Sequence, residues 1–341
     1  MELKTFDPCG GAFLRVGRHA PQESVCHLWW SGSGVRMNIS CTTLEVEAEA
    51  STHDHAQWLA VLVDGAPVAR IPLTPGIRRY PVLAGMDAGV THEVAIVRDT
   101  QPSYDEDKPV LLHAVLSDGT PAAPELRPLR LEFIGDSLTV GEGCLGPESA
   151  EEWRMPWISH HTAFPVLVAE ALHAEKNLCA LGGWGASRSW DNDENSRIGR
   201  IYDQLCAVTP GGDVPYDEVG RTDAVVINLG TNDGSALAKM TAEELPAAEK
   251  ALKDRAVELL AQVRARHPEA LILWAYGLCG HQVEPILQEA VVTRRQAGDA
   301  KVRYLSLTPA MSNGSRMHPS REAHRLAARE IIAALKEGGV L

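Results

Sequence analysis

The sequence Leu131-Glu132-Phe133-Ile134-Gly135-Asp136-Ser137-Leu138-Thr139 is a short apolar β run that breaks at a turn. Within Gly135-Asp136-Ser137-Leu138, only Ser137 can be a strong nucleophile. An open α/β sheet presents reacting groups at the carboxyl ends of its strands, on turns of this kind. The stretch therefore predicts a serine at the edge of an α/β sheet, although Gly-Asp-Ser is also a common turn sequence.

Apolar strands and amphipathic helices alternate on the carboxyl side of residue 128. Segment 242–266, for example, carries apolar residues on one face and charges on the other, as a surface helix does. This alternation predicts a parallel, doubly wound sheet covered on both faces by helices. The predicted strands are Leu129–Ile134, Asn177–Leu181, Ala224–Leu229, Leu271–Tyr276 and Val302–Leu307, and the predicted helices are Phe164–Ala174, Ala242–Arg266, Glu284–Ala297 and Pro319–Lys336.

The part of the chain before residue 127 contains short strand-like runs separated by turns, with no convincing helix. Leu44–Ala48 alternates with period two, as a half-exposed strand does. Trp58–Val63, Asp64-Gly65 and Val68–Ile71 form the pattern of a hairpin around an Asp-Gly turn. We therefore predict a β-sandwich (jelly-roll) domain over residues 1–127 and an α/β domain over residues 128–341, with a proline-rich linker at 120–128.

The composition excludes several classes of partner. The chain has 341 residues and a formal net charge of −13, and it contains no basic run, so neither nucleic acid nor an anionic membrane surface is expected as a partner. No apolar stretch is long enough to span a bilayer, and the N-terminus has no signal-peptide core. The seven scattered cysteines fit reduced thiols. These features predict a cytoplasmic protein, while its oligomeric state stays open.

Two further strand ends carry groups that can stabilise a developing negative charge. The strand 224–229 runs directly into Gly230-Thr231-Asn232-Asp233, where the Asn232 amide can donate to an oxyanion without changing its protonation state. Gly182-Gly183-Trp184-Gly185 follows the strand 177–181 and allows a backbone N–H to approach a ligand closely. Asx turns, helix caps and tight turns use the same residues, so neither segment is decisive alone.

His318 is the candidate general base, because an imidazole titrates near neutral pH and can transfer protons there. Pro319 biases the preceding residue away from the helical region and suits the first position of the next helix. A surface histidine at a helix start is the alternative. However, the four segments all follow strands of one sheet, so nucleophile, oxyanion donors and base are predicted to meet at one edge.

Two other motifs are interpreted as structural. Gly141-Glu142-Gly143-Cys144-Leu145-Gly146 has the spacing of a dinucleotide-binding loop, but it does not join a strand to an apolar helix. His53-Asp54-His55 could ligate a metal, but no third ligand cluster accompanies it. We therefore expect a site that requires neither metal nor cofactor.

The four segments around Ser137, Gly183, Asn232 and His318 resemble, in order and spacing, the conserved blocks of the SGNH (GDSL) hydrolases over roughly residues 129–337. Trp30-Ser31-Gly32-Ser33-Gly34-Val35 and the β region after it look like the jelly roll of carbohydrate esterase family two, whose members remove acetyl groups from hemicellulose sugars. The resemblance implies a flavodoxin-like three-layer α/β/α domain preceded by a jelly-roll sandwich.

The resemblance also implies roles for individual residues. Ser137 becomes the nucleophile and His318 the base. The oxyanion hole is then formed by Gly183, Asn232 and the backbone N–H of Ser137. Most SGNH hydrolases place an aspartate three residues before the histidine, whereas this chain has Ser315 there and no Asp or Glu between residues 301 and 317. Some enzymes of carbohydrate esterase family two work as Ser-His dyads with a backbone carbonyl orienting the imidazole, and we expect the same here.

The predicted substrate-binding residues are Trp184, Asp136 and Trp190. Trp184 lies in the predicted oxyanion loop and Trp190 follows six residues later. Sugar rings have apolar faces that stack on indole, although core packing is the usual place for tryptophan.

The function expected from the resemblance is that of a serine carboxylic-ester hydrolase that removes acetyl groups from xylan or mannan oligosaccharides through an acetyl-enzyme. One alternative is a lipid, thioester or aryl esterase on the same catalytic frame. A second alternative, of a different class, is an inactive carbohydrate-binding protein, which the missing acid at Ser315 would favour.

Overall fold

The computed structural model describes residues 2–217, 220–310 and 314–340, and these residues form two compact units. Unit 1 comprises Met1–Leu126, Arg154–Pro156 and Gln204–Glu218; unit 2 comprises the rest of the chain. The predicted boundary at residue 127 lies beside the first break between the units. The sequence interpretation did not anticipate the two later segments, because nothing in their composition marks them as part of the first unit.

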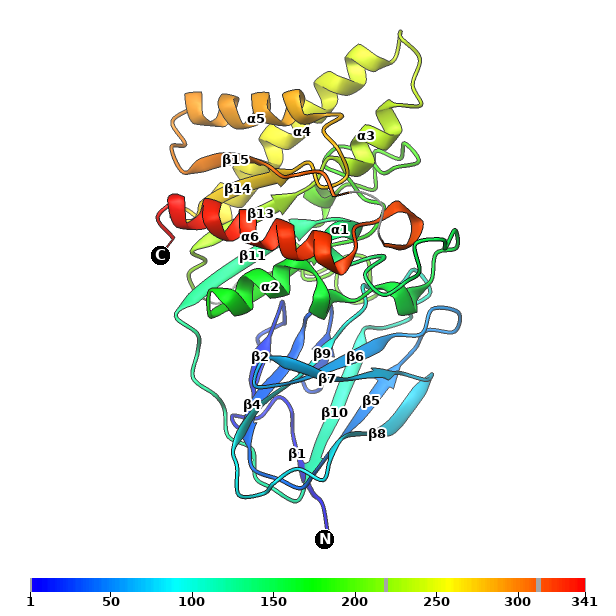
Figure 1. Cartoon of the computed structure of the whole chain (residues 1–341), viewed down its shortest axis with the longest axis vertical. Coiled ribbons are helices and arrows are strands. Elements are labelled where there is room, and N and C mark those ends of the chain that lie inside the picture. Colours follow the sequence, from blue (N-terminus) through cyan, green and yellow to red (C-terminus); the bar gives the residue numbers. More distant parts are fainter. Residues whose placement is uncertain (1, 218–219, 311–313, 341) are drawn as a thin grey trace. The chain divides into compact units, whose positions relative to one another are not determined.

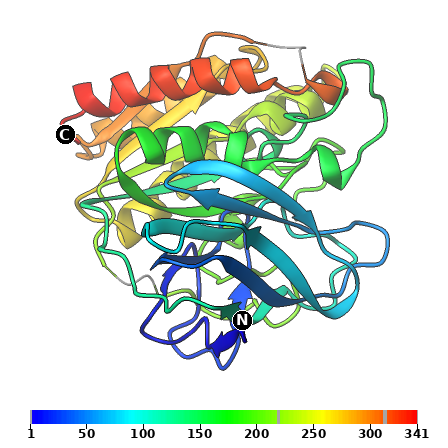
Figure 2. The same ribbon diagram turned by 60° about the horizontal axis from the view of Figure 1, so that its bottom comes forward.

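Unit 1 is built on two antiparallel sheets of five strands each (Figures 1 and 2). One sheet has the order β1-β10-β5-β8, with β3 also paired to β10, and the other has the order β2-β4-β9-β6-β7. The strands are β1 (Lys4–Phe6), β2 (Leu14–Val16), β3 (Cys26–Leu28), β4 (Gly34–Ile39), β5 (Thr43–Ala50), β6 (Trp58–Val63), β7 (Ala66–Pro72), β8 (Gly76–Ala84), β9 (His92–Arg98) and β10 (Val110–Ser117).

Local sequence explains the elements of unit 1. In β5 every second side chain is buried, as its period-two pattern predicts. The β6–β7 hairpin turns at Asp64 and Gly65, whose φ values of 51° and 79° are the left-handed values of a type I′ turn. The apolar faces of both sheets enclose one buried core. The prediction of an all-β N-terminal region is confirmed.

The segment Gln204–Glu218 is attached to the rest of unit 1 through buried hydrogen bonds. The indole Nε1 of Trp30 donates to the carbonyl of Leu205 at 2.7 Å, and the Arg18 guanidinium donates to the carbonyl of Gln204 at 2.8 Å. Both side chains are fully buried. Trp30, the first residue of the 30–35 motif, therefore binds a residue that lies 175 positions further along the chain.

Unit 2 is organised around a five-stranded parallel sheet of order β12-β11-β13-β14-β15. In chain order this is 2-1-3-4-5, the flavodoxin-like arrangement. The five predicted strands are all present, and every residue of β13 and β14 is buried, as expected for a sheet covered on both faces. The predicted fold class is confirmed. The strands are β11 (Leu129–Gly135), β12 (Ala174–Ala180), β13 (Ala224–Asn228), β14 (Leu271–Tyr276) and β15 (Val302–Ser306).

Helices cover both faces of this sheet (Figure 1), with α2 packed against α6 and α4 packed against α5. The helix predicted from Pro319 starts at Arg321 instead, because the Ser320 hydroxyl accepts a hydrogen bond from Ala323 N and caps it. Two short helices, α1 and α3, have no counterpart in the prediction. The helices are α1 (Ser137–Val140), α2 (Phe164–Ala171), α3 (Thr231–Leu237), α4 (Leu245–Arg266), α5 (Glu284–Gln296) and α6 (Arg321–Glu337), with 3₁₀ turns η1 (Met155–Trp157), η2 (His160–Thr162), η3 (Ile198–Arg200) and η4 (Ser315–Met317).

Within the described residues, no helix combines the length and the apolar character needed to cross a membrane.

Candidate active site

Ser137 is held at the carboxyl end of strand β11, which lies between β12 and β13, and it forms the first residue of helix α1. Asp136 precedes it as the helix cap, and its carboxylate accepts a hydrogen bond from Leu138 N at 3.0 Å. Gly135 allows the sharp turn, because a Cβ at that position would overlap the Thr139 hydroxyl. The strand-to-helix junction therefore fixes the serine against rigid backbone at the edge of the sheet.

His318 lies beside Ser137, although 181 positions separate them in sequence. Its Nε2 is 3.0 Å from the Ser137 Oγ, and its Nδ1 is 3.0 Å from the backbone carbonyl of Arg316. Since a carbonyl can only accept, Nδ1 carries the proton and Nε2 is left to receive the proton of the serine hydroxyl. The predicted nucleophile and base are thus brought together, with a backbone carbonyl in the position expected to orient the ring.

The segment before His318 has an unusual backbone. Arg316 and Met317 have φ values of 55° and 61°, in the left-handed region that residues other than glycine seldom adopt. Gly143 contacts this segment closely, because a Cβ there would lie 2.6 Å from the Cβ of His318, and its carbonyl accepts from Ser315 N at 3.2 Å. The glycine motif 141–146, interpreted above as structural, therefore packs against the segment that carries His318.

The loop after β12 contains the second predicted oxyanion element. Gly183 has φ of 84°, so this position requires glycine or a strained substitute. Among the described residues, the backbone N–H groups of Ser137 and Gly183 donate no hydrogen bond. For Ser137 this follows from its place at the start of α1, where helix N–H groups have no partner within the helix.

Asn232 connects this loop to the nucleophile turn. Its side-chain nitrogen donates to the carbonyl of Trp184 at 2.8 Å and to the Asp136 carboxylate at 3.2 Å. Asn232 is 8% exposed and lies beside helix α1, which begins at Ser137. A role for its amide as an oxyanion donor stays a prediction. In that role, one of its N–H groups would have to donate to the oxyanion as well as, or instead of, to Trp184 or Asp136.

Asp233, which the sequence suggested only as a turn former, anchors the loop that carries Gly183 and Trp184. Its fully buried carboxylate accepts from Ala186 N at 2.8 Å, from Ser187 N and Oγ at 2.7 Å each, and from Arg188 N at 3.2 Å. These bonds attach the loop 182–188 to helix α3. The position directly after Asn232 was the available signal, but an aspartate at a strand end usually caps its own helix.

Two buried carboxyl groups lie behind the nucleophile. Burial raises the pKa of Asp136 to about 8, with the nearby charges of Asp233 and Glu142 acting in the same direction. Burial also raises the pKa of Asp233, although its hydrogen bonds oppose that shift. Asp136 is fully buried, and its predicted contact with substrate stays a prediction.

The two predicted tryptophans lie on the loop that carries Gly183. Trp184 is half-buried, and its carbonyl accepts from Asn232. Trp190 is 53% exposed, its backbone N–H donates to the Gly183 carbonyl at 3.1 Å, and the Lys239 ammonium lies 4.7 Å from its ring centroid. An exposed indole beside the oxyanion loop is suited to stacking on a sugar, which stays a prediction.

Glu142 also borders Ser137 and His318, and it was not predicted because it lies inside the glycine motif. One of its carboxylate oxygens is 3.6 Å from His318 Nε2 and 2.7 Å from the Arg316 guanidinium. Its side chain is 8% exposed. A carboxylate is therefore present near the imidazole, on the side opposite to that of the missing aspartate.

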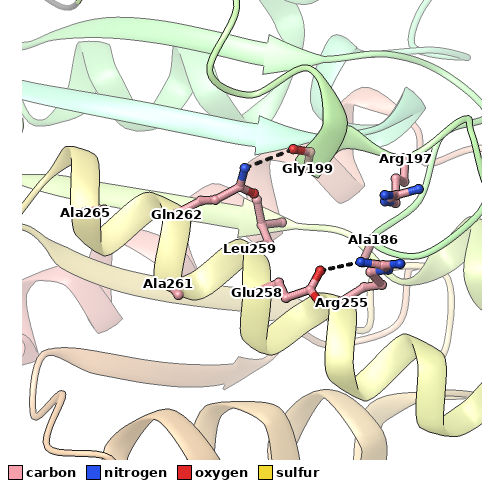
Figure 3. Close-up of a pocket in the computed structure, with 9 residues that line it drawn as sticks. All are labelled: Ala186, Arg197, Gly199, Arg255, Glu258, Leu259, Ala261, Gln262 and Ala265. Carbon is pink, nitrogen blue, oxygen red and sulfur yellow. Dashed lines mark hydrogen bonds and ion pairs between the residues drawn. The ribbon is translucent and has the colours of Figure 1, made fainter.

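Two other kinds of candidate site are a metal site and a separate cavity. In the described ranges, no cluster of three or more His, Cys, Asp or Glu side chains could hold a metal ion, and the N–H groups of residues 53–55 donate to Asp105. A cavity of about 530 Å³ lies between helix α4 and the segment 186–199 (Figure 3). Its charged lining includes Arg197 and an Arg255–Glu258 pair, and it contains neither Ser137 nor His318.

Comparison with protein families gives two matches that follow the two structural regions. Residues 133–326 match the GDSL-like Lipase/Acylhydrolase family, and residues 15–123 match the family described as Carbohydrate esterase 2 N-terminal. Among curated proteins, the chain is similar to the acetylxylan esterase/glucomannan deacetylase of Cellvibrio japonicus, with 24% identity over 89% of this chain and 83% of that protein. It is also similar to the cellulase/esterase CelE of Acetivibrio thermocellus, with 25% identity over 90% of this chain. The chain spans only 37% of the length of that second relative.

Solved structures of the same architecture cover almost the whole chain. An acetyl xylan esterase from the rumen bacterium Butyrivibrio proteoclasticus superposes with a TM-score of 0.94 at 25% identity, over 99% of this chain and 100% of that one. A family two carbohydrate esterase from Clostridium thermocellum, solved in complex with cellohexaose, superposes with a TM-score of 0.84 at 24% identity, over 96% of this chain and 100% of that one. At 24% identity, the second likeness shows a shared fold only.

Proposed function

Because the chain belongs to the GDSL-like lipase/acylhydrolase family, we propose that it is a carbohydrate O-acetyl esterase that removes acetyl groups from xylan- or mannan-type oligosaccharides. The observation that carries the proposal is the 3.0 Å contact between His318 Nε2 and Ser137 Oγ, with Nδ1 bound to a carbonyl. This arrangement can transfer an acyl group without a metal or an organic cofactor.

The reaction begins when Ser137 Oγ attacks the acetyl carbonyl carbon and its proton passes to His318 Nε2. The N–H groups of Ser137 and Gly183, with the Asn232 amide, stabilise the resulting oxyanion. The tetrahedral intermediate collapses, the sugar oxygen takes the proton from Nε2, and the acetyl group stays on Ser137. Water then attacks the acetyl carbon and gives a proton to His318 Nε2; the C–Oγ bond breaks, Ser137 Oγ takes that proton back, and acetate leaves. The Arg316 carbonyl keeps Nδ1 protonated through both halves of the reaction.

The substrate class is supported by the relatives and by one surface feature. The Cellvibrio relative is named for acetylxylan and glucomannan, and the Butyrivibrio structure for acetyl xylan. The match to the carbohydrate esterase 2 N-terminal family adds a second, separate region of likeness. Trp190, exposed beside the Gly183 loop, provides an apolar surface on which a sugar ring could stack.

The decisive experiment measures acetate release from acetylated xylo- and manno-oligosaccharides, with the acetylated positions read by NMR before and after treatment. Ser137→Ala should lower turnover by roughly three to six orders of magnitude, as loss of a nucleophile does in serine hydrolases. Ser235→Ala is the matched control, because Ser235 is an exposed serine of helix α3 that bonds only within its helix. Equal slow hydrolysis by the wild type and Ser137→Ala would favour an inactive binding protein instead.

A series of 4-nitrophenyl esters separates the sugar deacetylase from a lipid or thioester esterase. We expect a sharp optimum at acetyl, whereas a preference for butyryl or longer chains would contradict the proposal. The intracellular location of the substrate stays a prediction, and recovery of the native protein from the culture medium or cell wall would overturn it.

A further inference from the structure

His318, Arg316 and Glu142 contact one another in a ring, in addition to the contact between His318 and Ser137. Arg316 provides both the carbonyl that binds His318 Nδ1 and the guanidinium that pairs with Glu142 at 2.7 Å. The Glu142 carboxylate in turn lies 3.6 Å from His318 Nε2. The backbone N–H of Glu142 donates to the Ser137 carbonyl at 2.9 Å, so this carboxylate is also fixed relative to the nucleophile.

We propose that Glu142 and Arg316 form a positioning pair for His318, in which Glu142 stabilises the imidazolium that forms during the reaction and so replaces the missing acid of the triad. The proposal rests on the proposed function, since it concerns the base of that reaction. It assigns Glu142 an electrostatic role and Arg316 two roles, one through its backbone and one through its side chain.

The charges support this assignment. When Ser137 transfers its proton, Nε2 becomes an N–H donor and the ring becomes positive, 3.6 Å from a carboxylate oxygen whose side chain is 8% exposed. An opposite charge at this distance favours the protonated ring. The Arg316 carbonyl on the other nitrogen is neutral and stabilises the imidazolium less. Glu142 therefore supplies the negative charge that no residue between 301 and 317 provides.

Other titratable groups near His318 do not fill this role. His324 of helix α6 is fully buried, and burial, followed by the charge of His318, lowers its pKa to about 3, so it stays neutral. Asp136 lies behind Ser137 and interacts with Glu142, and its carboxyl is held largely protonated at neutral pH by its raised pKa. Arg316 is the cation that faces Glu142, and its side chain is 35% exposed.

The two members of the pair should act on the histidine with opposite signs. In Glu142→Gln the carboxylate is lost and the guanidinium remains, so protonation of His318 becomes less favourable. The acidic limb of the pH profile of kcat/KM should then move to lower pH by about one unit, and the plateau should fall roughly tenfold. In Arg316→Gln the carboxylate loses its counter-charge, and the limb should move to higher pH by about half a unit.

The test compares wild type, Glu142→Gln, Arg316→Gln and the double variant, using 4-nitrophenyl acetate at constant ionic strength. The double variant should restore the acidic limb toward its wild-type position, because both charges are gone. Glu258→Gln is the control: it breaks an exposed ion pair with Arg255 at 2.6 Å on helix α4, and it should leave the profile unchanged. Limbs that do not move, or that move in the same direction in both single variants, would overturn the proposal.

A second readout does not depend on activity. The titration of the His318 ring, followed by NMR and identified through a His318→Asn variant, should have its midpoint lower in Glu142→Gln than in wild type. If Glu142→Gln fails to fold, Arg316→Gln still gives the opposite-signed shift, because the changed side chain is partly exposed. If Ser137→Ala hydrolyses esters as fast as wild type, the proposed function fails, whereas an unmoved His318 midpoint in an active enzyme refutes the positioning pair alone.

Discussion

The two loops that flank Ser137 are held in place by different physical means. The loop 182–188 is attached by the fully buried carboxylate of Asp233, which accepts four hydrogen bonds from three consecutive residues. The loop 315–318 has no buried carboxylate within it. It is held by backbone hydrogen bonds, by close contact with Gly143 and by the partly exposed pair of Arg316 with Glu142.

The difference matches what the proposed mechanism requires of each loop. Oxyanion donors must not reorganise when charge develops, and a buried charge with several hydrogen bonds fixes them at the cost of desolvation. The histidine instead has to gain and lose a proton in each half-reaction. Its ring is oriented by a neutral backbone carbonyl, and the carboxylate beside it is paired with the Arg316 guanidinium.

Removing the Asp233 carboxylate should damage the oxyanion side most. In Asp233→Ala the N–H groups of residues 186–188 lose their acceptor inside the protein, which costs about 3 kcal/mol or more of unfolding free energy. Turnover should fall roughly 100- to 1,000-fold, as it does when an oxyanion donor is lost. Urea unfolding and kcat for acetyl esters measure the two effects.

The control for this change is Asp193→Asn. Asp193 also accepts a backbone hydrogen bond, from Asn195 N at 2.9 Å, but its carboxylate is on an exposed residue. This variant should stay close to wild type in both measurements. If Asp233→Ala keeps wild-type turnover, the loop does not depend on the buried carboxylate.

Adding one methyl group should disturb the histidine side. In Gly143→Ala the new Cβ would lie 2.6 Å from the His318 Cβ and 2.9 Å from the Ser315 carbonyl, at a residue with φ of 82°. We expect His318 to move away from Ser137 and kcat to fall about 100-fold, because a displacement of about 1 Å costs that much.

Gly298→Ala separates steric displacement from backbone strain. Gly298 has φ of 99°, also in the left-handed region, and its Cβ would meet no atom within 4 Å. Both variants should lose about 1 kcal/mol of stability through strain, while only Gly143→Ala should lose turnover. Equal losses of activity in the two variants would mean that the contact with His318 is unimportant.

The same contrast explains what the sequence could predict. The five strands of unit 2 and their order could be predicted because apolar runs and the helices between them follow local rules, and Ser137, Gly183, Asn232 and His318 lie at strand ends or at the loop before the last helix. The Asp233 anchor and the Glu142 contact could not be predicted, since each depends on a partner 45 or more positions away. Nor could the position of Asp136 behind the nucleophile, because burial is set by packing and not by turn propensity.

The buried carboxyl of Asp136 should make stability depend on pH. Its pKa is about 8 in the folded protein against an ordinary value of about 4, so the folded state binds more protons than the unfolded state between these pH values. Stability should therefore decrease as pH rises from about 4 to 8, by at most a few kcal/mol. Asp136→Asn removes the titration and can still cap helix α1, so the variant should lose less stability over this range.

Thermal unfolding of wild type and Asp136→Asn across pH 4 to 9 checks this prediction. Asp233 contributes a slope of the same sign in both proteins, so the difference between the two curves isolates Asp136. Parallel curves would mean that Asp136 ionises freely in the folded protein. The result bears on the comparison of the two loops, because Asn232 bonds to Asp136 as well as to Trp184 and so joins the nucleophile turn to the oxyanion side.

The smallest effect is expected at Trp190, where the well-anchored loop would meet the substrate. A Cβ placed on Gly183 would lie 3.2 Å from the edge of the Trp190 ring. The exposed indole therefore borders the predicted oxyanion loop. Trp190→Ala should raise KM for acetylated oligosaccharides roughly three- to tenfold, equivalent to about 1 kcal/mol of binding. Because 4-nitrophenyl acetate has no sugar ring to stack, its kcat/KM should stay at the wild-type value, and Trp190→Phe should keep most of the oligosaccharide affinity. A fall in kcat for both substrates would show that Trp190 supports the Gly183 loop and does not bind sugar. In that case Trp190, like Asp233, would hold this loop in place.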